Sequence, residues 1–372
     1  MIRLLVVDDS AFMRKVLSDL FKNESDFVVV DVARNGVEAV EKVVQHSPDV
    51  VTLDIEMPLM DGLTALEKIM SVKPTPVVMV SSLTKAGADA TIRALSLGAV
   101  DFVAKTAGAI SRIDEISNEL LQKCRAASKV SGIRLQTSAP KPLVMKAGTG
   151  FQPVKPTPAV QVEKVASTPT IIPPITGVSD WIVAIGTSTG GPRALQEVLT
   201  KLPGNLPCPT IVVQHMPPGF TRSLAERLNT LCALNVKEAE DNDRLVAGTV
   251  FVAPGDFHLT IRREGGAAFV KLNKDPAIGG LRPAVDPMMV SVAEVYGSRT
   301  VGVILTGMGH DGAVGIKAIK KINGLTIAED QSTAVVFGMP KAAIEVGAID
   351  TVLPLPQVAD GIMQCLKKGG LK

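Results

Sequence analysis

A proline-rich stretch constrains the fold more than any other feature of the sequence. Residues 128–178 hold eight prolines, six lysines or arginines and a single acid, Glu163. Proline cannot donate a backbone hydrogen bond and disfavours helix, so this stretch is poorly suited to a packed domain. A structureless loop of this length is abnormal inside one domain. We therefore predict a flexible linker at 128–178 between two domains, residues 1–127 and 179–372.

The first domain alternates short apolar runs with stretches of helical periodicity. The runs are continuously apolar, which is typical of parallel strands buried on both faces. Strands are predicted at Ile2–Val7, Phe27–Val32, Val50–Leu53, Pro76–Ser81 and Val100–Ala104. Helices are predicted at Ala11–Phe21, Gly36–Gln45, Leu63–Ser71, Lys85–Leu97 and Ile113–Ala126. This order predicts a doubly wound α/β domain with a parallel sheet.

The second domain begins with the same strand–turn–helix order. Strands are predicted at Trp181–Ile185, Thr210–Val213, Val250–Ala253, Phe257–Ile261 and Thr300–Leu305. Helices are predicted at Pro192–Leu202, Pro218–Cys232, Asp286–Tyr296 and Ala313–Ile322. We therefore expect a second doubly wound α/β domain after the linker.

Composition excludes several classes of function. The net charge is only +2 and aromatic residues make up 3% of the chain, which argues against nucleic-acid binding. The four cysteines form no C-x-x-C pair, so a structural zinc or iron–sulfur site is not expected. No apolar run is long enough to span a membrane, and Asp8 and Asp9 interrupt any signal peptide. We expect a soluble, cytoplasmic protein.

Charged and polar residues follow the predicted strands of the first domain. Asp8 and Asp9 follow the first strand, Asp54 ends the third, Ser81 ends the fourth and Lys105 follows the fifth. The carboxyl ends of parallel strands form one edge of the sheet, where ligands bind. Three carboxylates repel one another unless a cation joins them, and all-oxygen ligands suit Mg²⁺. The pattern predicts a magnesium site beside a carboxylate that can attack a phosphoryl group.

The same residues carry a resemblance to a known family. Val6-Val-Asp8-Asp9-Ser10, Asp54-Ile-Glu56-Met-Pro58, Val80-Ser81-Ser82 and Phe102-Val-Ala-Lys105 look like the motifs of a response-regulator receiver domain. The resemblance covers about residues 1–125 and implies a flavodoxin-like fold.

The resemblance also implies roles for these side chains. Asp54 would accept phosphate from a histidine kinase, with Lys105 neutralising phosphoryl oxygens. Mg²⁺ would be held by Asp9, Asp54 and the backbone carbonyl of Glu56, and by Asp8 through water. Ser81 and Phe102 stand at the family's switch positions.

The second domain offers a candidate nucleophile. The segment Gly186-Thr-Ser188-Thr-Gly190 is a G-x-S-x-G between a predicted strand and a predicted helix. Such a turn exposes the serine near backbone N–H groups at a helix N-terminus. A phosphate-binding turn is the alternative, but the spacing is not G-x-G-x-x-G and no P-loop lysine follows. The turn favours Ser188 as a nucleophile for acyl transfer.

A serine nucleophile needs a base, and the chain has four histidines. His46 and His258 fit structural positions. His215 and His310 each follow a predicted strand, so the base is either His215 with Asp311 or His310 with another acid. The first pairing is simpler, since adjacent residues in a turn point apart. Backbone N–H groups of Thr189 and of the loop around Met308 are candidate oxyanion donors.

A second resemblance covers this domain. Ile185-Gly-Thr-Ser-Thr-Gly-Gly191, Gln214-His-Met-Pro-Pro-Gly219, Arg282-Pro-Ala-Val-Asp286 and Leu305-Thr-Gly-Met-Gly-His-Asp-Gly312 look like the catalytic domain of the chemotaxis protein-glutamate methylesterases, the CheB family. The resemblance implies a Rossmann-like fold and maps the triad onto Ser188, His215 and Asp311. Thr187 stands where many members have alanine, a minor departure.

These resemblances imply a phosphorylation-activated serine esterase. It would hydrolyse glutamate methyl esters on chemoreceptors, deamidate receptor glutamines at the same site, and take phosphate from the chemotaxis histidine kinase. Mg²⁺ in the receiver would be its one cofactor, and we expect a monomer with an open, shallow substrate cleft. The alternatives are a DNA-binding or a nucleotide-binding output domain. The first would need a basic recognition helix, which residues 179–372 lack.

Overall fold

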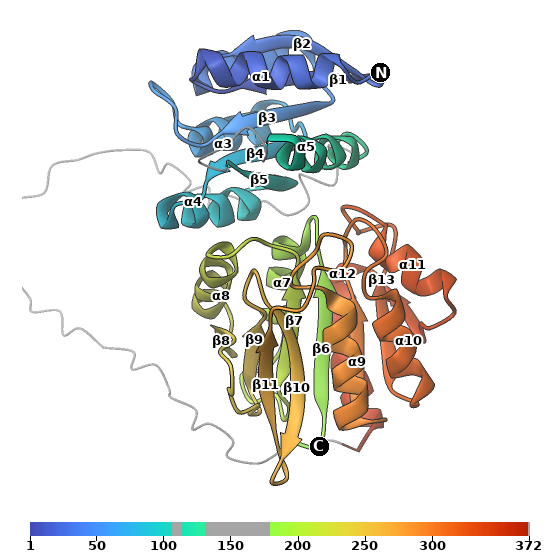
Figure 1. Ribbon diagram of the computed structural model, residues 1–372. Helices are drawn as coiled ribbons and strands as arrows, with labels where there is room; N and C mark the ends of the chain where they lie inside the picture. Colours follow the sequence, from blue (N-terminus) through green and yellow to red (C-terminus); the bar gives the residue numbers. More distant parts are fainter. Residues whose placement is uncertain (106–112, 131–178, 371–372) are drawn as a thin grey trace, which may run out of the picture.

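The computed structural model describes residues 1–105, 113–130 and 179–370, which form two α/β domains stacked on one another (Figure 1). The first domain has a parallel sheet of five strands in the order β2-β1-β3-β4-β5. Its elements are β1 (Ile2–Val7), α1 (Ala11–Lys22), β2 (Phe27–Ala33), α2 (Gly36–His46), β3 (Val50–Asp54), α3 (Gly62–Val72), β4 (Val77–Ser82), α4 (Lys85–Ser96), β5 (Asp101–Lys105) and α5 (Ile113–Ala127). Every predicted bound of this domain is confirmed to within one residue.

Local chemistry explains this agreement. A polar side chain precedes each of the helices α1 to α4 and accepts a backbone N–H from its first turn: Ser10, Asn35, Asp61 and Thr84. These caps satisfy N–H groups that have no partner within the helix. Helices α1 and α5 pack on one face of the sheet, and α2, α3 and α4 pack on the other. The apolar strands are therefore buried on both faces, as their composition predicts.

The second domain contains a parallel sheet of seven strands in the order β14-β13-β12-β6-β7-β9-β8. Its strands and helices are β6 (Ile182–Thr187), α7 (Gly191–Leu199), β7 (Thr210–Gln214), α8 (Phe220–Leu231), β8 (Asn235–Glu238), β9 (Thr249–Val252), β10 (His258–Glu264), β11 (Ala267–Asn273), α9 (Val285–Tyr296), β12 (Thr300–Ile304), α10 (Ala313–Lys321), β13 (Leu325–Glu329), α11 (Met339–Glu345), β14 (Thr351–Leu353) and α12 (Leu355–Lys368). The doubly wound parallel fold is confirmed, with α7, α8 and α12 on one face and α9 and α10 on the other.

Two parts of this domain differ from the sequence expectation. The strand predicted at Phe257–Ile261 does not belong to the large sheet, because β10 pairs antiparallel with β11 as a separate hairpin. The sequence expectation contains no element after Ile322, where the structure has β13, α11, β14 and α12. Of these, β14 at the sheet edge is short and mostly exposed. An exposed edge strand has no continuous apolar run, so composition does not reveal it.

The two domains contact one another through a continuous apolar cluster. Helix α4 of the first domain packs against α7 and α8 of the second. The ring of Phe102 stacks on Phe220, with centroids 4.6 Å apart and planes inclined by 20°. This contact covers the edge of the large sheet at which β6 and β7 end (Figure 1).

The proline-rich segment predicted as a linker lies, from residue 131 to 178, outside the described residues. Within the described part of the chain, no helix is both long and apolar enough to cross a membrane.

Candidate active site and phosphorylation site

Three acids converge at the carboxyl edge of the five-stranded sheet. Strand β1 pairs with β3 in parallel, so the turn after β1 lies beside the end of β3. Ligand oxygens of Asp8, Asp9 and Asp54 all lie within 4.8 Å of one another. Asp8 and Asp54 are buried and Asp9 is exposed. A cluster of hard oxygen ligands with one open side fits a divalent cation such as Mg²⁺.

Lys105 neutralises part of this negative charge. Its Nζ lies 2.9 Å from Asp8 Oδ2 and 2.8 Å from Asp54 Oδ2. Burial raises the pKa of Asp54, and the hydrogen bond from Lys105 opposes this rise. Burial lowers the pKa of Lys105, but its bonds to the two carboxylates outweigh burial and raise it. The lysine therefore stays charged beside the predicted phosphorylation site, where it can pair with phosphoryl oxygens.

The remaining residues predicted for this domain lie on β4, on β5 and in the turn after β3. Ser81 is fully buried, and its hydroxyl donates to the carbonyl of Gly87 in α4 at 3.1 Å. Glu56 is exposed in the turn after β3, where its backbone follows Asp54 and Ile55. Phe102 is 3% exposed because its ring is packed against the second domain. The two residues predicted as switch positions therefore contact α4 and Phe220.

The predicted nucleophile lies on a tight turn between β6 and α7. Ser188 is partly exposed, and its backbone N–H donates to the carbonyl of Thr306 at 3.0 Å. Gly190 has a φ of +79°, which side-chain-bearing residues rarely adopt. A Cβ on Gly191 would lie 1.9 Å from Gln214 Oε1, so only glycine fits this close approach. Gly190 and Gly191 thus shape the turn that carries Ser188.

His215 and Asp311 form a hydrogen-bonded pair beside this turn. His215 follows β7, the neighbour of β6, and its Nε2 lies 2.7 Å from Asp311 Oδ2. The side chains are 6% and 8% exposed. Burial would raise the pKa of Asp311, but hydrogen bonds from His215 and from the N–H groups of Val285 and Asp286 outweigh burial and lower it. Asp311 is therefore ionised, and the Nε2 of His215 carries the proton.

The other histidines have different surroundings. His310 is exposed, although it precedes Asp311 directly. His258 is 2% exposed, with Nδ1 accepting the N–H of Ala284 and Nε2 lying 3.2 Å from the carbonyl of Pro276. His258 is thus a structural residue, as its sequence position predicts. His46 Nε2 lies 3.1 Å from Asp31 Oδ2 in the first domain. Of the four histidines, His215 is the one that has both a carboxylate partner and a backbone bond to the turn that carries Ser188, as a base with its orienting acid requires.

The predicted oxyanion donors lie on two loops next to Ser188. Thr189 lies in the turn between β6 and α7, and Met308 lies in the loop after β12. The carbonyl of Gly307 accepts the N–H groups of Gly338 and Met339, which fixes this loop. Among the described residues, neither the Thr189 nor the Met308 N–H has a backbone partner, so both can donate to a substrate.

Sequence reasoning missed several residues that build this site. Gln214 and Thr306 donate side-chain hydrogen bonds to the carbonyls of Ser188 and Thr189 in the nucleophile turn. The backbone N–H of Asp286 donates to Asp311. Asp101 also escaped notice: its Oδ2 accepts the hydroxyl of Thr189 at 2.5 Å, from the first domain. Gln214 ends β7, Thr306 follows β12 and Asp101 begins β5, whereas Asp286 lies in the first turn of α9. Polar residues at strand ends and in first helical turns are too common to single these out.

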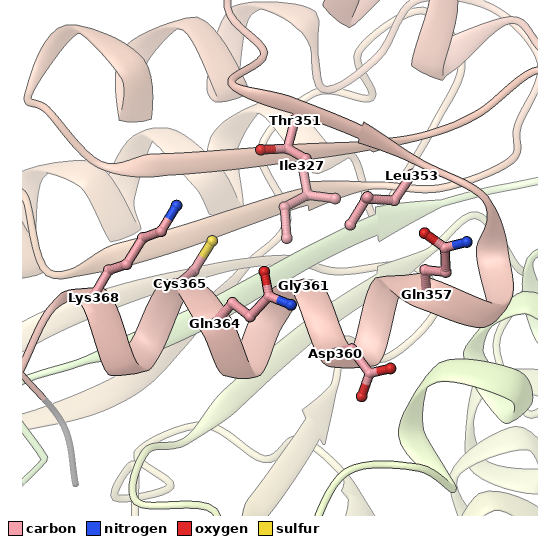
Figure 2. A pocket seen from close by; sticks show the side chains of 9 residues that line it. All are labelled: Ile327, Thr351, Leu353, Gln357, Asp360, Gly361, Gln364, Cys365 and Lys368. Atoms are coloured by element: carbon pink, nitrogen blue, oxygen red, sulfur yellow. The ribbon is translucent and has the colours of Figure 1, made fainter.

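A cavity of about 250 Å³ lies away from these residues, between α12 and the edge strands β13 and β14 (Figure 2). Its lining includes Cys365, Gln364 and Lys368 from α12 and Leu353 from β14, and none of the predicted site residues. Figure 2 shows no histidine and no serine in the cavity wall, so it lacks the groups for serine-based hydrolysis.

Comparison with known proteins identifies both domains. The sequence model of the response regulator receiver domain matches residues 4–116, and that of CheB methylesterase matches residues 183–362. The chain is thus a response regulator whose output domain is an esterase.

Whole-chain relatives make this assignment specific. The protein-glutamate methylesterase/protein-glutamine glutaminase of Pyrococcus abyssi is 46% identical over 99% of this chain and 95% of its own length. The protein of the same name from Symbiobacterium thermophilum is 49% identical, over 99% of this chain and 98% of its own length. The crystal structure of the Thermotoga maritima CheB methylesterase catalytic domain matches with a TM-score of 0.50 and 51% identity, covering 50% of this chain and 99% of that domain. The chain belongs to the protein-glutamate methylesterase/protein-glutamine glutaminase family.

Proposed function

We propose that Ser188, His215 and Asp311 hydrolyse glutamate methyl esters on chemoreceptors, and that phosphorylation of Asp54 controls this activity. The observation that carries the proposal is the short contact between His215 and Asp311 beside the G-x-S-x-G turn. An ionised acid holds the Nε2 proton, so Nδ1 is the ring nitrogen left to act as a base.

The reaction follows from these roles. Ser188 Oγ attacks the side-chain ester carbonyl while His215 Nδ1 takes its proton. The N–H groups of Thr189 and Met308 stabilise the oxyanion. His215 then protonates the methoxy oxygen, methanol leaves, and an acyl-enzyme remains. Water, deprotonated by His215, hydrolyses it to glutamate. A glutamine side chain would follow the same path with ammonia as the leaving group.

Control by the first domain is supported by its contact with the nucleophile turn. Asp101 bonds the hydroxyl of Thr189, the residue directly after Ser188, and Phe102 stacks on α8. A domain in this position obstructs an extended protein substrate. A phosphoryl group at Asp54 would draw Ser81 towards it and alter the β4–β5 surface. The contact between the domains then weakens. A modification shifts the equilibrium between docked and undocked domains when its free energy differs between those two states.

Asp9, Asp54 and the carbonyl of Glu56 would hold Mg²⁺, with Asp8 acting through water, and the ion would neutralise charge during phosphoryl transfer. The phosphodonor is a chemotaxis histidine kinase. Lys105 already bridges Asp8 and Asp54 and would pair with the phosphoryl oxygens. The enzyme acts as a monomer in the cytoplasm, and its esterase site uses no cofactor.

The proposal is tested by methanol release from membranes that carry methyl-esterified chemoreceptors. Ser188→Ala should abolish release, and His215→Ala should reduce it about as severely. His310→Ala is the matched control, because His310 is exposed and should leave activity unchanged. Full activity of Ser188→Ala would contradict the nucleophile, and loss only in His310→Ala would move the base to His310.

A fragment starting at Ser179 tests the control by obstruction. It should release methanol faster than the unphosphorylated whole chain, because Asp101 and Phe102 are absent. Equal rates would mean that the first domain acts in another way, such as localisation at the receptor.

A further inference from the structure

A buried carboxyl group lies at the end of β13, outside both sites described above. Glu329 is 0% exposed. Its Oε2 accepts the backbone N–H of Thr306 at 2.8 Å, and its Oε1 accepts the hydroxyl of Thr333 at 3.1 Å. Burying a carboxyl group costs free energy, so its position calls for a physical reason.

Thr306 connects Glu329 to both sides of the predicted nucleophile. Its carbonyl accepts the N–H of Ser188 at 3.0 Å and the hydroxyl of Thr187 at 2.9 Å. Its own hydroxyl donates to the carbonyl of Thr189 at 2.9 Å. The peptide group before Ser188 and the one after Thr189 are therefore both tied to Thr306, whose own backbone N–H is bound by Glu329.

The segment that follows Glu329 continues this support. The Thr306 hydroxyl accepts the N–H of Val336 at 2.9 Å, and the Val336 carbonyl accepts the N–H of Gly307 at 3.1 Å. Gly190 lies against the side chain of Val335, where a Cβ would be only 2.6 Å from the valine Cβ. Residues 330–338 thus bind the loop of the predicted oxyanion donor and abut the nucleophile turn.

The surroundings of Glu329 shift the pKa of its carboxyl group towards neutral pH. Burial, together with the nearby Asp330, raises the pKa of Glu329 and outweighs the bonds from Thr306 and Thr333 and the charge of Arg193 in α7, which lower it. The resulting pKa is about 7. A carboxyl oxygen accepts the Thr306 N–H in either protonation state, because a protonated carboxyl retains an acceptor oxygen.

We propose that Glu329 is a positioning residue of the esterase: it holds Thr306 and, through it, the turn that presents Ser188. The inference rests on the proposed role of Ser188 as nucleophile. Reacting groups must be held within a fraction of an ångström of their productive geometry, so loosening this turn slows the chemical step. Substrate binding, which uses other surfaces, should change little.

The test measures kcat and KM for methanol release from methyl-esterified receptor membranes, using the full chain. Glu329→Ala should lower kcat by roughly tenfold or more, because it leaves the Thr306 N–H without a partner, with KM nearly unchanged. Glu329→Gln keeps an acceptor of the same length and should retain most of the activity. Glu329→Asp withdraws the carboxylate by one methylene and should lose activity as Glu329→Ala does, which keeps the test decisive if the alanine variant does not fold.

The matched control is Thr326→Val on the same strand. Thr326 is fully buried, and its hydroxyl bonds Asp350 without touching Thr306, so the variant loses stability but should keep kcat. A wild-type kcat in folded Glu329→Ala or Glu329→Asp overturns the proposal. The proposal is also overturned if kcat falls as much in Glu329→Gln as in Glu329→Asp, or if Thr326→Val lowers kcat equally. Ser188→Ala separates the positioning role of Glu329 from the proposed function. If Ser188→Ala stays active, Ser188 is not the nucleophile and the proposed function itself is wrong.

Discussion

Replacing Glu329 by glutamine should change how the stability of the catalytic domain depends on pH. The pKa of this carboxyl is about 7 in the folded chain, against about 4.5 for an ordinary glutamate. Between these values the folded state binds a proton that the unfolded state has released. The free energy of unfolding therefore falls as the pH rises from about 4.5 to about 7, and stays lowered above that.

The size of the effect follows from the shift. A pKa difference of about 2.5 units corresponds to about 3 kcal/mol of unfolding free energy. Glutamine cannot titrate, so the variant lacks this loss. The unfolding free energy of Glu329→Gln minus that of the wild type should therefore increase by about 3 kcal/mol between pH 4.5 and pH 8. Other titrating groups are common to both chains and cancel in the comparison.

Urea unfolding followed by tryptophan fluorescence measures this difference. The chain has a single tryptophan, Trp181, which is 8% exposed directly before β6 and therefore reports on the catalytic domain alone. Parallel pH dependence of the two chains would refute the reasoning, since it would mean that the Glu329 carboxyl titrates alike in the folded and unfolded states.

Three further outcomes are expected. Asp54→Asn should leave basal methanol release intact but remove its stimulation by acetyl phosphate; stimulation that persists would point to another acceptor. Asp101→Ala should raise the basal activity of the unphosphorylated chain by roughly tenfold, because it removes a buried, charge-assisted bond to Thr189; unchanged basal activity would mean that this bond does not hold the domains together. Chelation of divalent ions by EDTA should stop phosphorylation by acetyl phosphate yet leave the release of methanol by the fragment from Ser179 unaffected, and inhibition of that fragment would contradict a cofactor-free esterase site.

The local sequence determined much of the fold and the identity of the reactive groups. Continuous apolar runs such as Trp181–Ile185 favour strands that are buried on both faces, and capping residues such as Asn35 and Asp61 mark helix starts. The glycines around Ser188 require a tight turn after a strand. These are short-range effects, since each depends on residues within a few positions of one another, and a single sequence therefore reveals them.

Only the tertiary structure decided which distant groups meet. The sequence alone left His215 and His310 as alternative bases, and the folded chain brings His215 to Asp311, 96 positions away. The contacts from Glu329 to Thr306 and from Asp101 to Thr189 likewise join separate strands or separate domains. Such contacts depend on the order of strands in the sheet and on how one domain docks on the other. Both are set by the packing of whole surfaces, which local patterns do not encode.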